Sequence, residues 1–264
     1  MSDNRPRPHP TLSDVAEAAG VSSATVSRCL NAPERVAEAT RARVEAAVAA
    51  LGYTPHFAGM ALASKRTNTV GAVIPTMDNA IFARALQAME ETLAAEGVTL
   101  LVASSGYDPE REALQVRALL GRGVDGLLLI GAARPAPTYA LLEQRGVPLV
   151  LAWTDRAGQG GVPVGFDNAH AAKAMAERVL DLGHRHLAMI AGLTTGNDRA
   201  TARVAGVRAA LGYRGLALAP ERLIEAPYTL AAGEAAFATL MAQDPRPTAV
   251  LCGNDVLAAG ALRA

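Results

Sequence analysis

Residues 22–31 carry side chains whose types and spacing suit contact with double-stranded DNA. Seven of them are candidates for such contact: Ser22, Ser23, Ala24, Thr25, Ser27, Arg28 and Asn31. The Arg28 guanidinium is a forked donor that matches the acceptors of guanine in the major groove. Small residues at the start of a helix would let it approach base edges, and the hydroxyl and amide groups at its two ends are donors for phosphates. The spacing by itself is equally compatible with an ordinary helical bundle.

Capping and turn residues predict the elements that must position this segment. Thr11 and Asp14 form a capping-box pattern at the start of one short helix. Gly20 can adopt the left-handed conformation that ends a helix, and Ser22 can cap the next one. Two helices joined by a short turn with glycine form the helix-turn-helix pattern.

Apolar spacing gives each of these helices a buried side. The second helix is expected over about residues 23–30, and a third over about 38–51, ending at Gly52. The residues expected to be buried are Val26, Cys29 and Leu30 in the second helix and Val44, Val48 and Leu51 in the third.

From Thr69 onward, short apolar segments alternate with helical ones. Strands are expected at 70–74, 99–103, 127–130, 147–151, 163–166, 187–191, 223–225 and 249–252, and helices at 82–96, 109–120, 138–145, 169–182, 200–211, 232–242 and from 255. Continuous apolar strands that alternate with helices are typical of parallel sheets covered on both faces. The length favours two lobes, at about 67–157 and 162–264, with the change of lobe near Asp155–Phe166.

Polar and aromatic side chains in this α/β region suit a binding cleft for a small molecule. The candidates are Phe82, Asp167, Arg203, Tyr228, Asn254 and Asp255. Arg203 can clamp a carboxylate or neighbouring hydroxyls, the carboxylates and the amide can bind sugar hydroxyls, and the two rings offer apolar faces. Alternatively, Asp167 caps the helix over 169–182 and Asp255 caps the last helix.

Patterns that would indicate an enzyme or a metal site are absent or out of context. Residues 121–126 read Gly-Arg-Gly-Val-Asp-Gly, but they end a helix and enter a strand, whereas a dinucleotide fingerprint follows a strand and opens a helix. His184 and His186 with Asp181 could suggest a metal site, but residues 184–186 form an expected exposed turn that lacks a third close ligand. Cys252 has no evident base partner and is expected to pack in a strand. We therefore expect no catalysis, metal or cofactor.

Composition excludes several classes of protein. The 25 basic and 25 acidic side chains balance and 50% of the residues are hydrophobic, which rules out a polycation and a charge-driven disordered chain. The polar residues 1–10 form neither a signal peptide nor an anchor, and no apolar run is long enough to span a membrane. Cys29 and Cys252 cannot make a disulfide framework, so a reducing cytoplasm is the expected location.

The N-terminal pattern resembles that of the lactose-repressor (LacI/GalR) family of transcriptional regulators. The matching residues are 11–22, 25–28, 31, 40–41, 44, 51–53, 55 and 61–63. The resemblance implies a homodimer that places two helix-turn-helix domains, residues 11–55, in adjacent major grooves of a near-palindromic operator. Together with the seven residues above, the candidate DNA contacts are then Thr11, Leu12, Tyr53, His56 and Leu62. Ala37 stands where the family usually has a capping serine, so the third helix is expected to start less sharply.

The resemblance also assigns a hinge to residues 56–66. In the family, this segment becomes helical only on DNA, and Leu62 matches the leucine that wedges into the minor groove and kinks the duplex. His56–Ser64 is too short to form a stable free helix, which fits folding on binding.

The remainder resembles the periplasmic-binding-protein-like effector domain of the same regulators. The matching residues are Pro75, Asn79, Phe82, 165–168, 183–186, Arg203, Gly206, Asn254 and Asp255. This implies an all-α helix-turn-helix domain with a hinge, followed by a two-lobed α/β domain that binds its effector between the lobes. Residues 164–168 and 183–186 resemble gluconate-type repressors, which implies a sugar or sugar-acid effector. A purine-type corepressor is the alternative, and a small-molecule binding protein without a DNA role is a more distant one.

The implied function is that of a repressor whose DNA affinity is set by the effector, through lobe orientation and the hinge. The chain stops at Ala264, inside the helix that begins at Asp255, whereas family members continue with further strands. We therefore expect a C-terminally truncated polypeptide, with an incomplete effector domain and low stability.

Overall fold

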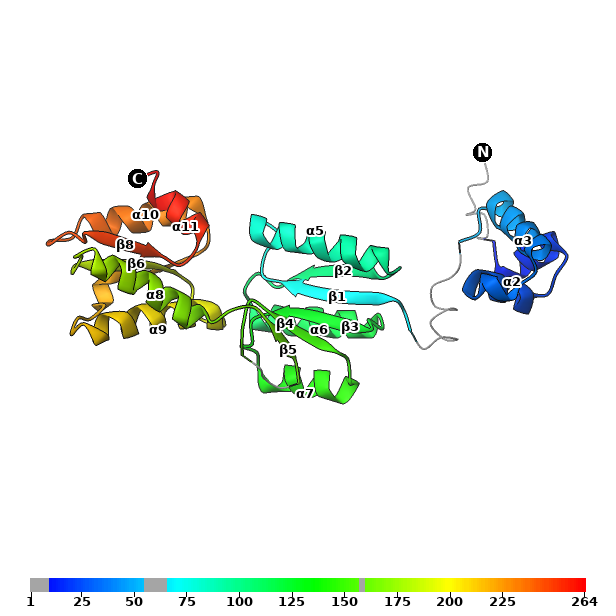
Figure 1. Cartoon of the computed structure of the whole chain (residues 1–264), viewed down its shortest axis with the longest axis horizontal. Helices are drawn as coiled ribbons and strands as arrows, with labels where there is room; N and C mark the ends of the chain where they lie inside the picture. Colours follow the sequence, from blue (N-terminus) through cyan, green and yellow to red (C-terminus); the bar gives the residue numbers. More distant parts are fainter. Residues whose placement is uncertain (1–9, 55–65, 157–159) are drawn as a thin grey trace, which may run out of the picture. The chain divides into compact units, whose positions relative to one another are not determined.

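A computed structural model describes residues 10–54, 66–156 and 160–264 (Figure 1). The chain divides into two units, Met1–Thr67 and Asn68–Ala264. The sequence predicted the change from the hinge to the effector domain between residues 66 and 67.

The described part of the smaller unit contains three α-helices: α1 (Leu12–Ala19), α2 (Ser23–Asn31) and α3 (Glu38–Leu51), with a 3-10 turn η1 (Pro33–Arg35) before α3. The predicted capping box is confirmed: the Asp14 amide donates to the Thr11 hydroxyl and the Thr11 amide donates to the Asp14 carboxylate. The amide and the hydroxyl of Thr11 both donate to the Asp14 carboxylate and hold its pKa below its usual value. Gly20 has the left-handed φ of 63°, and Ser22 caps α2.

A small apolar core holds these helices together. It consists of Val15, Ala16, Ala19, Val26, Cys29, Val44, Ala47 and Tyr53. Leu51 was expected in this core but is 38% exposed. The chain turns back after the left-handed Gly52 and places Tyr53 against the core. As expected at Ala37, α3 begins without a side-chain cap.

The first lobe of the larger unit is a parallel sheet in the order β2-β1-β3-β4-β5. Its strands are β1 (Thr69–Ile74), β2 (Thr99–Ser104), β3 (Gly126–Ile130), β4 (Leu149–Ala152) and β5 (Val162–Val164), and its helices are α5 (Ala80–Ala95), α6 (Pro109–Gly121) and α7 (Ala136–Arg145). In Figure 1, α5 covers one face of the sheet and α6 and α7 cover the other. Such two-sided burial explains why the strands read as continuous apolar runs.

The second lobe is a parallel sheet in the order β7-β6-β8 within residues 160–264. Its elements are α8 (Asn168–Asp181), β6 (Leu187–Gly192), α9 (Asp198–Tyr213), the 3-10 turn η2 (Pro220–Arg222), β7 (Leu223–Ala226), α10 (Leu230–Met241), β8 (Ala249–Cys252) and α11 (Asp255–Ala261). Leu187 and Met189 of the central strand pack toward α8 and α9, while Ala188 and Ile190 pack toward α10 and α11.

The predicted two-lobed α/β fold is confirmed, and every predicted strand and helix is present with bounds shifted by a few residues. One boundary was wrong. Residues 162–164 were assigned to the second lobe, but β5 pairs with β4 in the first sheet, with Val150 opposite Val162. A three-residue strand carries too little pattern to reveal its partner, so only its hydrogen bonds assign it to a lobe.

Candidate functional site

The outer side of α2 presents the side chains that the sequence selected for DNA contact. Ser22, Ala24, Arg28 and Asn31 are exposed, and Ser23, Thr25 and Ser27 are half-buried. Val26 and Cys29 turn inward. The polar residues therefore form one surface of the helix, and Arg28 extends from it.

Local hydrogen bonds order both ends of this surface. The hydroxyls of Ser22 and Thr25 lie 2.9 Å apart, and the Thr25 amide donates to Ser22 Oγ at 3.2 Å. At the other end, Asn31 Nδ2 donates to the Ser27 carbonyl at 2.9 Å. Arranged donors at a helix N-terminus, where the helix dipole is positive, are well suited to an anionic phosphate.

Tyr53, a predicted DNA contact, is only 8% exposed and belongs to the core of the helical unit. A large apolar ring stabilises a small core, which explains its inward position. Thr11 is exposed and bonded within its capping box, and Leu12 packs at the edge of the core. His56 and Leu62 lie outside the described residues.

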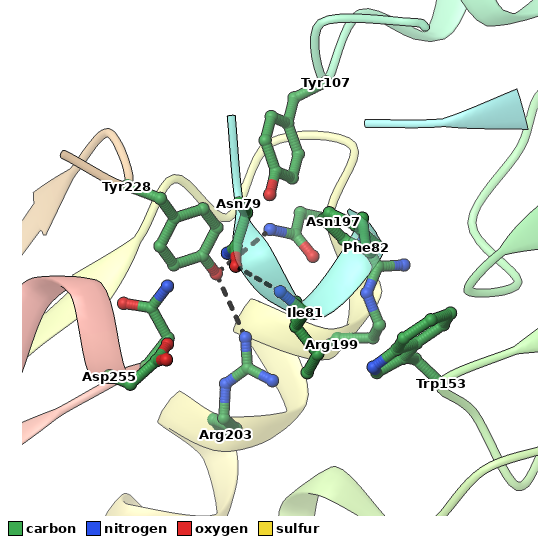
Figure 2. A pocket seen from close by; sticks show the side chains of 11 residues that line it. Asn79, Ile81, Phe82, Tyr107, Trp153, Asn197, Arg199, Arg203, Tyr228 and Asp255 are labelled. Atoms are coloured by element: carbon green, nitrogen blue, oxygen red, sulfur yellow. Dashed lines mark hydrogen bonds between the residues drawn. The ribbon is translucent and has the colours of Figure 1, made fainter. Parts of the chain in front are cut away.

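In the larger unit, a cavity of about 90 Å³ lies between the two lobes. We call it the interlobe cavity; it is lined by Asn79, Ile81, Phe82, Tyr107, Trp153, Asn197, Arg199, Arg203, Tyr228, Asn254 and Asp255 (Figure 2). These residues follow the carboxyl ends of strands in both sheets or stand at the start of the next helix. Open parallel sheets place their ligands at this edge.

Arg203, on α9, forms the polar centre of the cavity. Its Nη1 donates to Asn168 Oδ1 at 2.6 Å and its Nη2 donates to the Tyr228 hydroxyl at 3.0 Å, as Figure 2 shows for Tyr228. Asn197 Nδ2 reaches the same hydroxyl at 3.4 Å. Arg203 Nε is buried and has no hydrogen-bond partner among the described residues. A buried donor without a partner is costly, so an acceptor at this point would bind favourably.

Aromatic rings form the apolar walls. Phe82 and Trp153 meet edge to face with their centroids 5.3 Å apart, and Tyr107 lies 5.5 Å from Tyr228. Tyr107 and Trp153 both have left-handed backbone conformations, with φ of 63° and 59°. Bulky residues rarely adopt this conformation, and such strain concentrates at functional sites. Burial, together with the nearby Tyr228, raises the pKa of Tyr107 to about 12, so its hydroxyl stays protonated.

Charge in the cavity is unevenly distributed. Arg199 and Arg203 bring two guanidinium groups, whereas Asp255 is the one carboxylate among the lining residues. Burial lowers the pKa of Arg199 from its ordinary value, and the adjacent Asp198 opposes that shift. Asp198 pairs with Arg199 at 2.9 Å, whereas no carboxylate among the described residues pairs with Arg203, so Arg203 favours a ligand with an acidic group.

Five of the six residues predicted for the cleft line the cavity: Phe82, Arg203, Tyr228, Asn254 and Asp255. Asp167 does not. It is exposed and caps α8, accepting from the amides of Ala169 at 2.8 Å and His170 at 2.9 Å, and these bonds lower its pKa. The capping alternative is therefore the correct one for Asp167. For α11, the cap is Asn254, whose Oδ1 accepts from the Leu257 amide at 2.9 Å.

Several lining residues were not predicted: Asn79, Ile81, Tyr107, Trp153, Asn197 and Arg199. Asn79 had been matched to a family loop without a role. Most of them stand one to a few residues beyond a strand, so applying the strand-end rule to every loop would have found them.

The structure agrees with the exclusion of the dinucleotide motif, because α6 ends at Gly121 and β3 begins at Gly126. His184 Nδ1 lies 2.9 Å from Thr248 Oγ1. The residues that the structure describes contain no cluster of three metal-binding side chains. Cys252 packs beside the core of the second lobe, and burial raises its pKa. Among the described helices, none has both the length and the apolar character needed to cross a membrane.

Comparison with known proteins identifies both units. Residues 67–264 match the family described as periplasmic binding proteins and the sugar binding domain of the LacI family, and residues 11–56 match the bacterial regulatory proteins of the lacI family. The chain is 31% identical over 252 residues to the HTH-type transcriptional regulator GntR of Escherichia coli strain K12, an alignment that covers 96% of this chain and 75% of the relative.

Solved structures give the same result. A LacI-family transcriptional regulator from Silicibacter pomeroyi is 31% identical with a TM-score of 0.87, covering 96% of this chain and 76% of that one. The lac repressor dimer bound to operator and the anti-inducer ONPF is 28% identical with a TM-score of 0.78, over 96% and 76% of the two chains. The chain therefore belongs to the LacI family and is a DNA-binding transcriptional regulator with an effector-binding domain.

Proposed function

We propose that this repressor reads its operator with the outer side of α2 and that a sugar acid bound in the interlobe cavity sets its affinity for DNA. The observation that carries the effector assignment is Arg203, whose Nε is buried without a partner in the described structure while its other nitrogens are bonded. Arg203, which lines the cavity, thus has a donor for which the described chain supplies no acceptor.

On the DNA side, the support is that different residues of α2 suit base reading and phosphate contact. Arg28 is exposed and free to reach a base edge, and a bidentate contact to guanine discriminates by about 1–3 kcal/mol against other bases. Thr25 and Ser22 stand at the helix start, where donors meet phosphates and set register. We assign sequence reading to Arg28 and positioning to Thr25.

On the effector side, the support is the mixture of charge and aromatic surface. Arg199 and Arg203 suit a carboxylate, Asp255 and Asn254 suit hydroxyls, and the rings of Phe82 and Trp153 offer apolar faces to a carbon chain. At present the Tyr228 hydroxyl accepts from Arg203 Nη2. A bound acid would accept from Arg203 Nη2 in place of the Tyr228 hydroxyl and would displace Tyr228. The present position of Tyr228 in the cavity also accounts for its small free volume.

A planar purine is the second candidate effector. Four aromatic side chains line the cavity: Phe82, Tyr107, Trp153 and Tyr228. Rings of this kind stack well on a base. The Arg203 guanidinium, which pairs with no carboxylate among the described residues, favours the sugar acid over a neutral purine, so the two candidates differ in the charge that the ligand must carry.

Trp153 provides a direct test of the effector. It is the single tryptophan of the chain and lines the cavity, so its emission reports occupancy. The full chain is titrated with potassium D-gluconate, D-glucose and hypoxanthine. We expect the Trp153 emission to change saturably with gluconate and to change much less with glucose. Saturation with hypoxanthine alone would reverse the assignment in favour of the purine, and no response to a wider panel of sugar acids would refute it.

Selection of DNA from a randomised duplex library tests the reading side. The unmodified chain, Arg28→Ala, Thr25→Ala and the control Arg208→Ala, an exposed arginine on α9, are compared by sequencing the bound DNA. We expect Arg28→Ala to lose preference at one base pair of each half-site. Thr25→Ala should keep the preference but bind all DNA more weakly. An unchanged motif with Arg28→Ala would show that another residue reads the bases.

A further inference from the structure

The two lobes are joined by hydrogen bonds from the start of α9 to the loop that follows β3. Asp198 Oδ2 accepts from the Ala132 amide at 2.7 Å, and Arg199 Nη1 donates to the Ile130 carbonyl at 3.0 Å. Asp198 and Arg199 belong to the second lobe, whereas Ile130 and Ala132 belong to the first. Asp198 Oδ1 also accepts from Arg199 Nη1 at 2.9 Å, so the two side chains act as one unit. We call these four residues the clasp.

The clasp is largely removed from water. The side chains of Arg199 and Asp198 are only 11% and 14% exposed. Hydrogen bonds to charged groups in such surroundings are stronger than neutral ones, and breaking one partner leaves a buried charge unpaired. The clasp is therefore capable of setting the distance between the lobes.

Gly131, between the two bonded residues of the loop, is shaped for this contact. It has a left-handed φ of 73°, and a Cβ there would lie 1.8 Å from Arg199 Nη1 and 2.4 Å from Asp198 Oδ1. The approach of the two side chains thus depends on a residue without a side chain. Gly146 has a similar φ of 60° but open space around its missing Cβ, which makes it a matched control.

A buried ion pair fixes the same loop from inside the first lobe. Arg134 Nη1 donates to the Gly131 carbonyl at 2.7 Å and its Nη2 donates to the Ile130 carbonyl at 3.0 Å. Its Nε lies 2.6 Å from Glu112 Oε1, and its side chain is 1% exposed. These bonds fix the loop within the first lobe. The contacts of the loop with Asp198 and Arg199 therefore position the whole lobe and not the loop alone.

Arg199 connects the clasp to the ligand site, because the same guanidinium lines the interlobe cavity. Its Nη1 is engaged with Ile130 and Asp198, whereas Nε and Nη2 have no hydrogen-bond partner among the described residues. A ligand that binds these two nitrogens would hold Arg199 in the position that the clasp requires.

We propose that Asp198 and Arg199 are positioning residues that clasp the lobes together and link occupancy of the interlobe cavity to lobe closure. The link to an effector rests on the proposed function, but the clasp itself does not. When the clasp is broken, more open arrangements of the lobes become populated, and the apparent affinity falls with the fraction of closed molecules.

The lobe distance is measured by double electron–electron resonance in the full chain, without added ligand. Spin labels are attached at Glu143→Cys in α7 and Tyr213→Cys in α9, both exposed, in a Cys29→Ala, Cys252→Ala background. The clasp variants are Asp198→Asn and Gly131→Ala. Their controls are Asp181→Asn, which removes an Asp–Arg pair with Arg214 inside the second lobe, and Gly146→Ala.

We expect a single distance population in the parent and both controls, and an additional longer population in both clasp variants. Superimposable distributions in all five proteins would overturn the clasp. Circular dichroism melting identifies a variant that fails to fold. Gly131→Ala is a second way to break the clasp besides Asp198→Asn, and Gly146→Ala controls for the strain of placing alanine at a left-handed φ.

Binding of potassium D-gluconate, followed by Trp153 emission, tests the link to occupancy. We expect the Kd to rise about tenfold in Asp198→Asn and Gly131→Ala and to stay unchanged in the two controls. An unchanged Kd in the clasp variants, when their distances have changed, would overturn the link. If gluconate does not bind the parent, the effector proposal fails while the distance measurement still decides the clasp.

Discussion

At the scale of single residues, Arg203 carries most of the chemistry of the cavity. Asn168 and Tyr228 hold two of its nitrogens, which fixes the plane of the guanidinium and leaves Nε buried without a partner among the described residues. A fixed fork of this kind recognises a planar carboxylate better than a mobile point charge does.

Arg203→Lys is therefore expected to weaken binding of a sugar acid by about 10- to 100-fold although the charge is retained. Titration of Trp153 emission measures the Kd of the variant and the parent. Arg208→Ala, on the exposed side of the same helix, should bind as the parent does. Equal Kd values for Arg203→Lys and the parent would mean that the charge alone, without the fork, recognises the ligand.

Residue types in the sequence predicted part of this site but not all of it. Arg203, Tyr228 and Asn254 are conspicuous because polar groups stand next to buried strands. Tyr107 and Trp153 enter the cavity through left-handed backbone conformations, which no residue pattern around them predicts. Arg199 has the sequence environment of an ordinary surface arginine at a helix start. Its burial results from the approach of the other lobe, which only the folded chain reveals.

At the scale of elements, caps and turns were the most predictable features. The side chains of Thr11, Ser22 and Asp167 each cap a helix. In each case the side-chain oxygen accepts from a backbone amide of the first turn that is only two or three residues away in sequence. Information of this kind is local, so the sequence contains it. The position of β5 depends on a partner strand and was assigned to the wrong lobe.

Thr11→Ala tests the contribution of the first cap. The hydroxyl accepts from the Asp14 amide, and removing such an N-cap lowers the free energy of unfolding by about 1 kcal/mol. Chemical denaturation of the helical unit, followed by circular dichroism, measures this loss. Thr54→Ala, an exposed threonine after α3, serves as the control and should change little. A loss no larger than that of the control would show that the capping box does not stabilise α1.

At the scale of the whole molecule, the chain consists of two units with separate cores. The larger unit contains two lobes with their own apolar clusters, which meet at the interlobe cavity and the clasp. Alternating strands and helices made this fold class predictable, because each element must bury an apolar face against a sheet. The contacts between lobes were not predictable, because they join residues far apart in sequence.

Because the two units have separate cores, we expect a destabilising substitution in one unit to leave the stability of the other unchanged. Leu240 is fully buried in the second lobe, so Leu240→Ala should destabilise the larger unit by about 2–5 kcal/mol. Differential scanning calorimetry should show the corresponding transition at lower temperature, with that of the helical unit unmoved. Leu262→Ala, at a residue that is 89% exposed, is the control. Equal shifts of both transitions in Leu240→Ala would contradict independent cores.

Occupancy of the interlobe cavity is proposed to set the affinity of the chain for DNA. The most direct measurement is the fluorescence anisotropy of a labelled duplex, selected by the parent chain, during titration with a sugar acid that saturates the Trp153 signal. We predict that the Kd for DNA changes at least about fivefold as the ligand saturates, and that Arg203→Ala abolishes this change while binding DNA normally without ligand. A Kd for DNA that stays constant while Trp153 reports full occupancy would contradict the account.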